Sequence, residues 1–448
     1  MRPSACPGLL RIVNARDGGI CRIKLPCGQL SSAQAHRVAD AAQRYASGVI
    51  ELTNRANLQI RGVRESFINT ESSINFLIET LIDAGLGPRT PGGDDVRNLM
   101  VSPSFGIDPD MVCDVTPLAE KILDALQTQP RFHELSPKFA VLLDGGERTA
   151  MLEHPHDLWL SALPVDEKAR DKQSGTELLF AFGLAGCPPT TADAPGGVAA
   201  VPASHALELV EAVLHVFLDH ARPEQTRMRH LLEGMPVADF LQHVQQRVSC
   251  RLLGNMAAWR RRPTPSLTHI GIHPQRQAGL CHIGAVPPLG RIDAAQLRVL
   301  ANLVHTCGDG TLRLTPQQSV LLPNIPQIAA DNVAQRLHAA GFAINRHDPL
   351  AQMIACSGAV GCIKGRADTK GDALLLAQLL GKKFVQTSVH LTGCERSCAA
   401  AHAAPFTLLA VVEGHYDLYQ RNGNAGLGEL IASDLDMQHA AALIMQRV

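Results

Sequence analysis

The chain has 448 residues, a formal net charge of −1, 46% hydrophobic residues and 19% charged residues. This composition predicts a globular protein of two or three domains, and the balanced charge gives no global sign of binding to nucleic acid or an anionic membrane. The stretch "MRPSACPGLL" has no basic segment followed by a long apolar one, so we expect no signal peptide. No apolar run approaches about 18 residues, so we expect a cytoplasmic protein without a transmembrane helix. In a reducing compartment its twelve cysteines indicate metal or redox chemistry more than disulfides.

The first predicted elements lie in a segment that the sequence repeats. Residues 28–63 align without a gap with residues 290–325, with seven identities in 36 positions. Each copy opens with a capping signature, Ser31-x-x-Gln34 in one and Asp293-x-x-Gln296 in the other. Helical periodicity follows, then a glycine and two short alternating strands. With the matching stretches "GGICRIKLP" and "AGLCHIGAVP" upstream, each copy is predicted to form an α+β strand–helix–strand–strand unit, and the two to pair about a pseudo-twofold axis.

The two copies differ in their arginines. Arg55 and Arg61 of the first copy are replaced by Gln317 and Pro323 in the second. Alternation in "LQIRG" places Arg61 on the strand face opposite Leu58, and a solvated strand face is the plain interpretation for one arginine. Because the second copy lacks both, we expect an asymmetric site that only the first copy serves.

Two further segments follow the repeats, at roughly 91–250 and 350–448. A weak echo aligns "KFAVLLDGG" (138–146) with "VQTSVHLTGC" (385–394), each an apolar strand that runs into a glycine turn. The stretches "GCPPTTADAPGGVAAVP" (186–202) and "RRRPTP" (260–265) are predicted loop and linker, and "RMRHLLEGMPVADFLQHVQQRV" (227–248) is predicted helical. The predicted domains are therefore 1–90, 91–265, 266–348 and 349–448.

Four cysteines near the C-terminus form the most specific pattern. "ACSGAVGCIKG" contains Cys356 and Cys362, and "LTGCERSCAA" contains Cys394 and Cys398, which gives C-x5-C and C-x3-C. Four thiolates can hold a [4Fe–4S] cluster or a structural zinc ion, but zinc sites favour shorter spacings in both halves. The surrounding small residues suit a backbone that wraps a bulky cluster and donates N–H groups to its sulfurs.

The other cysteines give a weaker signal. Cys21 and Cys27 have the same C-x5-C interval but no partner motif, so we interpret them as packing residues. The remaining cysteines are isolated and are predicted to be small buried side chains: Cys6, Cys113, Cys187, Cys250, Cys281 and Cys307.

Together these motifs resemble the sulfite and nitrite reductase superfamily. "LTNRANLQIRGV" is similar to its anion-binding stretch T-x-R-x-x-x-Q-x-[RH]-G, "GGDDVRN" to G-D-x-x-R-N, and "RMRHLL" to R-x-K-[YH]-[LI]. The resemblance implies an α+β fold of two ferredoxin-like half-domains about a pseudo-twofold axis, with two α/β domains for the cluster and a tetrapyrrole. It also implies a [4Fe–4S] cluster held by the four cysteines.

The resemblance further implies substrate-binding residues. Carried over by position, Arg55, Arg61 and Arg97 would hold a sirohaem-type tetrapyrrole and an anionic substrate. Of the family's lysine pair, "SPKFA" keeps Lys138 but has Ala140 at the second position, which weakens a sulfite reductase interpretation. The sequence assigns no catalytic residue.

Within the superfamily, the details resemble a branch of O2-dependent enzymes that hydroxylate precorrin-3A. The stretches that carry this are "ACPG", "RIKLPCGQLSSAQ", "ADTKGDA" and "YDLYQRNG". The branch implies a non-haem iron besides the cluster, for which His269, His273, His390 and His402 are candidates, although each is more simply a core or surface histidine. No G-x-G-x-x-G fingerprint occurs between a strand and a helix, so we expect electrons from a separate reductase, with NADH as ultimate donor by family implication.

Two alternatives remain open. The first is a sirohaem-dependent sulfite or nitrite reductase with the same fold. The second is a non-catalytic protein that binds or assembles tetrapyrroles or clusters.

Overall fold

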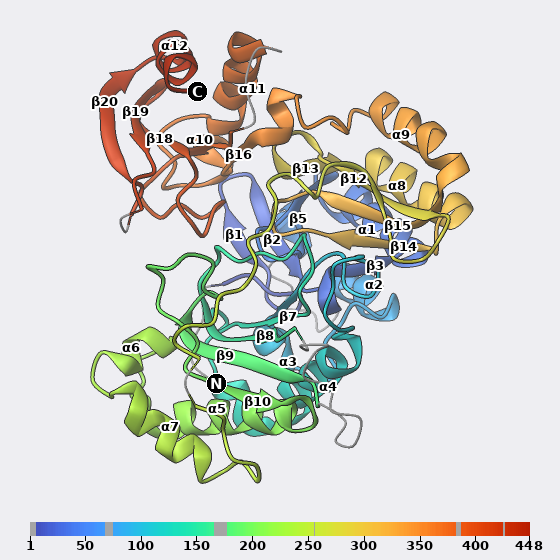
Figure 1. The fold of residues 1–448 in the computed structure, drawn as a ribbon. Coiled ribbons are helices and arrows are strands. Elements are labelled where there is room, and N and C mark those ends of the chain that lie inside the picture. The colour runs from blue at the N-terminus through green and yellow to red at the C-terminus, as the bar shows by residue number, and fades with distance from the viewer. Residues whose placement is uncertain (1–5, 68–74, 165–176, 255, 382–386, 424–425) are drawn as a thin grey trace. The chain divides into compact units, whose positions relative to one another are not determined.

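The structure is a computed structural model that describes residues 6–67, 75–164, 177–254, 256–381, 387–423 and 426–448. The chain forms two compact units, and most of their elements are labelled in Figure 1. The first unit comprises Met1–Leu10, Pro26–Gly28 and Gly87–Ser266, and the second comprises Arg11–Leu25, Gln29–Leu86 and Leu267–Val448.

Both repeats lie in the second unit, and each forms a five-stranded antiparallel sheet. In the first sheet the strand order is β1 (Val13–Ala15), β2 (Gly18–Ile23), β5 (Leu58–Val63), β4 (Val49–Leu52) and β13 (Arg291–Asp293). In the second it is β11 (Gly271–Pro274), β12 (Leu280–Ala285), β15 (Val320–Pro326), β14 (Thr311–Leu314) and β3 (Gln29–Ser31). Each copy therefore donates one strand to the sheet of the other, a reciprocal exchange that agrees with the predicted pseudo-twofold axis.

The repeat helices begin as the sequence predicts. Helix α1 (Ser32–Tyr45) is capped by Ser31 and helix α8 (Ala294–Cys307) by Asp293, and both capping boxes are complete. Gly48 and Gly310 follow the two helices with φ of 84° and 80°, a conformation that glycine adopts without strain. Helices α1 and α8 pack against each other, while α2 (Phe76–Asp83) lies against α1 and α9 (Ala330–Ala339) against α8.

Two mixed sheets share one topology. The first-unit sheet has the order β6 (Leu99–Val101), β7 (Val141–Asp144), β8 (His156–Ala162), β9 (Leu179–Gly186) and β10 (Ala199–Pro202). The second unit repeats it with β16 (Met353–Ala355), β17 (Val389–Thr392), β18 (Phe406–Val412), β19 (His415–Gln420) and β20 (Glu429–Leu435). In each, the first three strands are parallel and the last two antiparallel. The predicted echo is confirmed for β7 and β17, although residues 385 and 386 lie outside the described residues.

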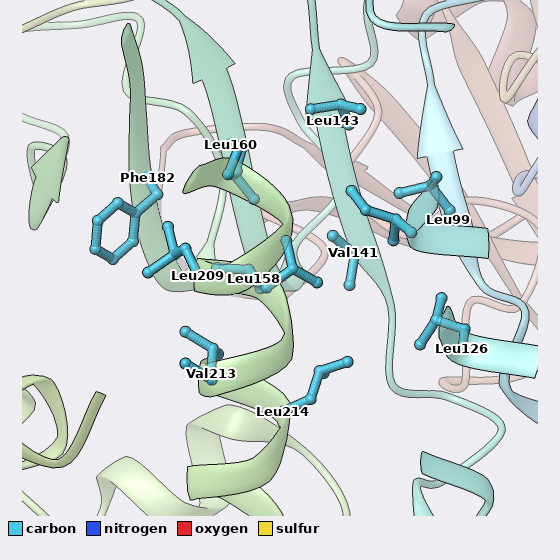
Figure 2. Close-up of a cluster of buried hydrophobic side chains, with 14 of the residues drawn as sticks. Leu99, Leu126, Val141, Leu143, Leu158, Leu160, Phe182, Leu209, Val213 and Leu214 are labelled. Atoms are coloured by element: carbon cyan, nitrogen blue, oxygen red, sulfur yellow. The ribbon is translucent and has the colours of Figure 1, made fainter. Parts of the chain in front are cut away.

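Helices cover the first-unit sheet and close its core. They are α3 (Gly93–Val96), α4 (Thr116–Thr128), α5 (Ala206–His220), α6 (Met228–Leu232) and α7 (Val237–Gln245). In Figure 2 the α5 side chains Leu209 and Val213 lie toward the strand residues Leu158, Leu160 and Phe182. All five are fully buried, so this apolar layer fixes the sheet against α5.

The sheet of β16 to β20 has its own core. It packs against α11 (Thr369–Leu380) and α12 (Met437–Arg447), with Leu376 and Ala440 among the fully buried side chains. The one-turn helix α10 (Gly358–Gly361) lies between the first two cysteines of the motif.

One prediction in the middle of the chain is confirmed and another needs correction. Residues 227–248 are helical as predicted, in two helices, α6 and α7, which Gly234 and Pro236 separate. The 186–202 segment is not all linker, since its end forms the edge strand β10 with buried Ala199 to Val201. Residues 260–265 have no regular structure, as expected, but Arg261 is buried and paired with Asp144.

All twelve cysteines are free thiols, and Cys21 and Cys27, the second pair with the C-x5-C interval, are packing residues as predicted. Cys21 is fully buried in β2, and Cys27 packs against the core of the first unit. Of the isolated cysteines, Cys281 is buried as expected, whereas the other five are half-buried. Among the described residues, no helix is both long and apolar enough to span a membrane.

Candidate functional site

The structure brings the two cysteine motifs to one edge of a sheet. Cys356 directly follows β16, and Cys394 comes two residues after the neighbouring parallel strand β17. Because the carboxyl ends of parallel strands meet at the same edge, the two loops lie side by side. The backbone confirms this, since the Cys356 N–H donates to Leu391 O (3.2 Å) and the Arg366 N–H to Gly393 O (3.1 Å).

The loops form a close backbone cradle around Cys356. Its Sγ accepts hydrogen bonds from the N–H groups of Gly393 (3.1 Å) and Gly358 (3.4 Å). A Cβ on Gly358 would lie 2.6 Å from Ala367 O, and one on Gly365 would lie 2.3 Å from the carbonyl carbon of Gly358. The sequence therefore needs small residues here because the loops touch through their backbones. N–H donors aimed at sulfur are what a thiolate ligand requires.

The four cysteines are close enough for electrostatic interaction to affect the pKa of Cys398. Burial raises the pKa of Cys398, and the nearby Cys394, Cys356 and Cys362 raise it further, against a lowering by Arg396. Four neighbouring thiolates are stable only where cationic metal neutralises them. Among the described residues, no three His, Cys, Asp or Glu side chains form a group that could hold a single metal ion. Four cysteines on two neighbouring loops, with N–H groups directed at Cys356 Sγ, are a donor set that suits a [4Fe–4S] cubane, which takes one thiolate at each of its four irons.

The matching loops of the first-unit sheet carry a polar network instead. By strand register, Ser102 and Gly146 stand where the second unit has Cys356 and Cys394, and Asp108 lies at the position of Cys362. Ser102 Oγ lies 2.9 Å from Thr149 Oγ1, and the buried Asp108 accepts from the Arg148 Nε–H (3.1 Å). The first unit therefore has the architecture of the cysteine loops without their ligands.

Equivalent turns from both repeats reach the second cysteine loop. Asn54 Nδ2 donates to Cys398 O (3.2 Å), and Gln318 Nε2 donates to Ala399 O (3.1 Å). The first turn is stabilised by Thr53 Oγ1, which accepts from the N–H groups of Arg55 (3.3 Å) and Asn57 (3.1 Å). Arg55 is half-buried and directly follows Asn54, whose side chain contacts the second cysteine loop.

Arg61 is not on a solvated strand face. It is 3% exposed, and its guanidinium donates to Asp17 (2.8 and 2.9 Å), Glu51 (3.4 Å) and Gly361 O (3.0 Å). Burial lowers the pKa of Arg61, but Asp17, Glu51 and Cys362 outweigh it and raise the pKa overall. The interpretation as a solvated face was wrong because the strand face opposite Leu58 is covered by the first cysteine loop.

Arg97 and Lys138 lie in the first unit. Arg97 is buried, pairs with Asp94 (3.2 Å) and donates to Gly87 O (3.1 Å). Burial lowers the pKa of Arg97, although Asp94 opposes this. Lys138 is exposed, and its backbone N–H donates to Ser136 Oγ (3.2 Å).

The four candidate histidines form two separate pairs within the second unit. His269 and His273 affect each other, as do His390 and His402. Burial lowers the pKa of His269 to about 3 and that of His390 to about 4. Among the described residues, no three-donor group is present that could hold a further iron.

The buried histidines predict an acid-sensitive second unit. An unfolded histidine takes up a proton near its ordinary pKa of 6.5, whereas folded His390 does so only near 4. Between these values the unfolded state binds more protons, so stability falls as pH falls, by about 1.4 kcal/mol per pH unit for each such group. In His390→Leu, hydrogen exchange of the β17 amides between pH 6.5 and 4.5 should show a shallower loss of protection. A slope equal to that of the unsubstituted protein would contradict this.

Sequence reasoning missed several residues of the site. Asn54 and Gln318 contact the second cysteine loop, and Lys370 and Glu51 lie under the first. The repeat alignment contained one usable signal, because Glu51 stands opposite Arg313, an inversion of charge at equivalent positions.

Comparison with protein families gives two matches. The family described as "Nitrite and sulphite reductase 4Fe-4S domain" matches residues 92–252. The family described as "Nitrite/Sulfite reductase ferredoxin-like half domain" matches residues 14–69 and 273–340. The first match covers the first-unit sheet, the copy without the cysteines. The ferredoxin-like match covers both repeats.

Individual relatives agree with these matches. The ferredoxin–nitrite reductase of Synechococcus elongatus is 30% identical over 87% of this chain and 76% of its own. The chloroplastic ferredoxin–nitrite reductase of Arabidopsis thaliana is also 30% identical, and the chain spans 66% of its length. A precorrin-3B synthase of Sinorhizobium sp is 27% identical over 99% of this chain and 88% of its own. The solved Mycobacterium tuberculosis NirA protein shares the fold, with a TM-score of 0.76, 21% identity, 95% of this chain covered and 79% of that one.

Proposed function

Because this chain belongs to the nitrite and sulphite reductase family, we propose that it is a precorrin-3B synthase, an iron–sulphur monooxygenase of aerobic cobalamin biosynthesis. Members of the family are oxidoreductases, and the comparisons support a [4Fe–4S] cluster, with sirohaem as the alternative tetrapyrrole. In the proposed reaction, precorrin-3A gains one oxygen atom from O2 as C20 is hydroxylated and a lactone closes. The other oxygen atom leaves as water, which takes two electrons and two protons.

The observation that carries this proposal is the extent of alignment. The precorrin-3B synthase of Sinorhizobium sp aligns over 99% of this chain and 88% of its own. The S. elongatus nitrite reductase has slightly higher identity, but 24% of its length has no counterpart in the alignment. Ala140 also favours the precorrin-3B synthase proposal. The family has a second lysine at this position, and the ammonium group of that lysine would stabilise a small oxyanion such as nitrite or sulfite.

Within the proposal, the four cysteines of the C-x5-C and C-x3-C motifs bind the cluster, which supplies one-electron transfer. Arg55 on its turn beside Cys398 binds a carboxylate of the tetrapyrrole. Arg97 and Lys138 remain proposed tetrapyrrole contacts, although Arg97 has Asp94 as a partner. Electrons come from an external carrier protein. The names of the related nitrite reductases identify ferredoxin as their carrier. For this chain we propose NADH as the ultimate electron donor, in the cytoplasm.

A second candidate is a sirohaem-dependent nitrite reductase. The identity of 30% to the S. elongatus and A. thaliana enzymes favours it. It would use the same cysteines and the same arginine turn. The two candidates differ in whether the tetrapyrrole is substrate or permanent cofactor.

The test is anaerobic purification followed by iron and labile sulphide analysis and an absorption spectrum. The protein is then incubated with a chemical reductant and precorrin-3A, with and without O2, and in parallel with nitrite or sulfite. A product one oxygen atom heavier than precorrin-3A, formed only with O2, supports the synthase. Bound sirohaem with nitrite turnover would establish the reductase instead, and binding of tetrapyrrole without turnover of any substrate would point to a non-catalytic protein.

A further inference from the structure

Glu51 is the centre of a buried group of charges beneath the first cysteine loop. Its Oε1 accepts from Arg291 (2.7 Å) and lies 3.8 Å from Lys370 Nζ, and its Oε2 lies 3.4 Å from both Arg61 and Ser357 Oγ. Burial raises the pKa of Glu51, but the three cations outweigh it and lower the pKa, so the carboxylate is charged. Asp17 completes the group through its bidentate pair with Arg61. We name these five side chains the charge bridge: Asp17, Glu51, Arg61, Arg291 and Lys370.

Two cations of the charge bridge donate hydrogen bonds to backbone carbonyls at the two ends of the first cysteine loop. Lys370 Nζ donates to the carbonyl of Ala355 (3.2 Å), the residue before Cys356. Arg61 donates to the carbonyl of Gly361 (3.0 Å), the residue before Cys362. Each cysteine of the C-x5-C motif therefore follows a peptide that a buried cation holds.

The internal repeat shows that the sheets form without this charge arrangement. Glu51 and Arg291 are cross-strand partners in β4 and β13, and the equivalent pair in β14 and β3 is Arg313 and Gln29. Pro323 stands at the position of Arg61. The strand exchange is complete on both sides, yet within the part of the chain that the structure describes, the carboxylate with its three cations is found on the side that carries the cysteine loop and not at the equivalent pair.

The net charge of the bridge has a consequence for redox chemistry. Three cations face two carboxylates, so the formal charge is +1. Glu51 and Arg61 are buried and Lys370 is nearly so, which weakens screening by water and salt around them, whereas Asp17 and Arg291 are partly exposed. Reduction adds an electron to an anionic thiolate-bound cluster. A buried positive charge stabilises the reduced form, and the net local charge is one of the levers that set cluster potentials.

We propose that the charge bridge positions the Cys356–Cys362 loop and sets the reduction potential of the cluster held there, with Glu51 and Lys370 acting in opposite directions. This inference rests on the proposed cluster ligands but not on the identity of the substrate. It also reassigns Arg61 from a substrate contact to a positioning residue, because its donors are directed to Asp17, Glu51 and Gly361.

The test measures the cluster midpoint potential by redox titration followed by electron paramagnetic resonance. At pH 7, below the pKa of about 8 that burial gives Lys370, the lysine is protonated. Lys370→Met is expected to shift the potential to more negative values and Glu51→Gln to more positive values, while the double variant returns close to the starting potential. The control is Arg298→Gln, a surface cation of α8 that pairs with Asp40 and is expected to leave the potential unchanged.

Shifts of opposite sign in the midpoint potentials of Lys370→Met and Glu51→Gln would distinguish an electrostatic effect from a structural disturbance of the loop. A purely structural role would move both variants in the same direction or lower their iron content, and unchanged potentials in cluster-loaded variants would likewise overturn the proposal. If Glu51→Gln does not fold, Asp17→Asn replaces it. That variant removes the other carboxylate of the charge bridge and is expected to shift the potential positively, opposite to Lys370→Met. A native protein without any cluster would instead refute the ligand assignment, and this role with it.

Discussion

Replacing Cys394 with serine is expected to remove the iron–sulphur cluster and all turnover while leaving a soluble, folded protein. Cys394 lies half-buried in the loop after β17, outside the apolar core formed by residues such as Leu376 and Tyr416. Its loss leaves three thiolates for four corners of the cubane, and a serine hydroxyl does not ionise near neutral pH. Iron and sulphide content, circular dichroism and activity measure the three parts of this expectation.

The matched control for this variant is Cys307→Ser. Cys307 is also half-buried in the second unit, at the end of α8, and does not belong to the cysteine motif. It should retain the full iron content. Full activity of Cys394→Ser would refute the ligand assignment.

Replacing Arg55 with alanine is expected to weaken tetrapyrrole binding by about 10- to 100-fold without loss of iron. A hydrogen bond between charged groups contributes roughly 1.5–3 kcal/mol, which converts to that range. The turn itself should survive, because Thr53 Oγ1 accepts from two of its backbone N–H groups and Asn54 ties it to the second cysteine loop. Titration of the tetrapyrrole by absorbance on cluster-loaded protein gives the dissociation constant.

The comparison variant for Arg55 is Arg44→Ala. Arg44 is an exposed cation of α1 that lies over the Tyr45 ring, so its removal changes net charge equally. Its affinity for the tetrapyrrole should equal that of the unsubstituted protein. Equal affinity in Arg55→Ala would place the tetrapyrrole elsewhere.

The local features of this fold could be predicted from sequence because local physics determines them. The capping residues Ser31 and Asp293 satisfy N–H groups within their own first turns, so their signatures sufficed. The cysteine spacing likewise located both loops. The reciprocal pairing of β3 with β14 and of β13 with β4 joins segments more than two hundred residues apart, and no local signal encodes such a partner.

The character of the site depended on packing that the sequence did not show. Alternation placed Arg61 opposite Leu58 correctly, but whether that face meets water or another loop is a tertiary property. The contacts of Asn54 and Lys370 with the cysteine loops are of the same kind. Four cysteines at fixed spacings indicate a ligand set from sequence alone. Nothing in the sequence distinguishes a lysine that becomes buried, such as Lys370, from one that stays on the surface.

The reciprocal strand exchange also has consequences for fragments of this chain and for the evolution of its two repeats. Because β13 completes the sheet of the first repeat and β3 that of the second, a chain cut between the repeats would give fragments with unsatisfied strand edges. Such edges attract other strands, so neither fragment would persist alone and the two would have to recombine. An ancestor with a single repeat could have met the same demand only as a homodimer, with gene fusion making the partnership permanent.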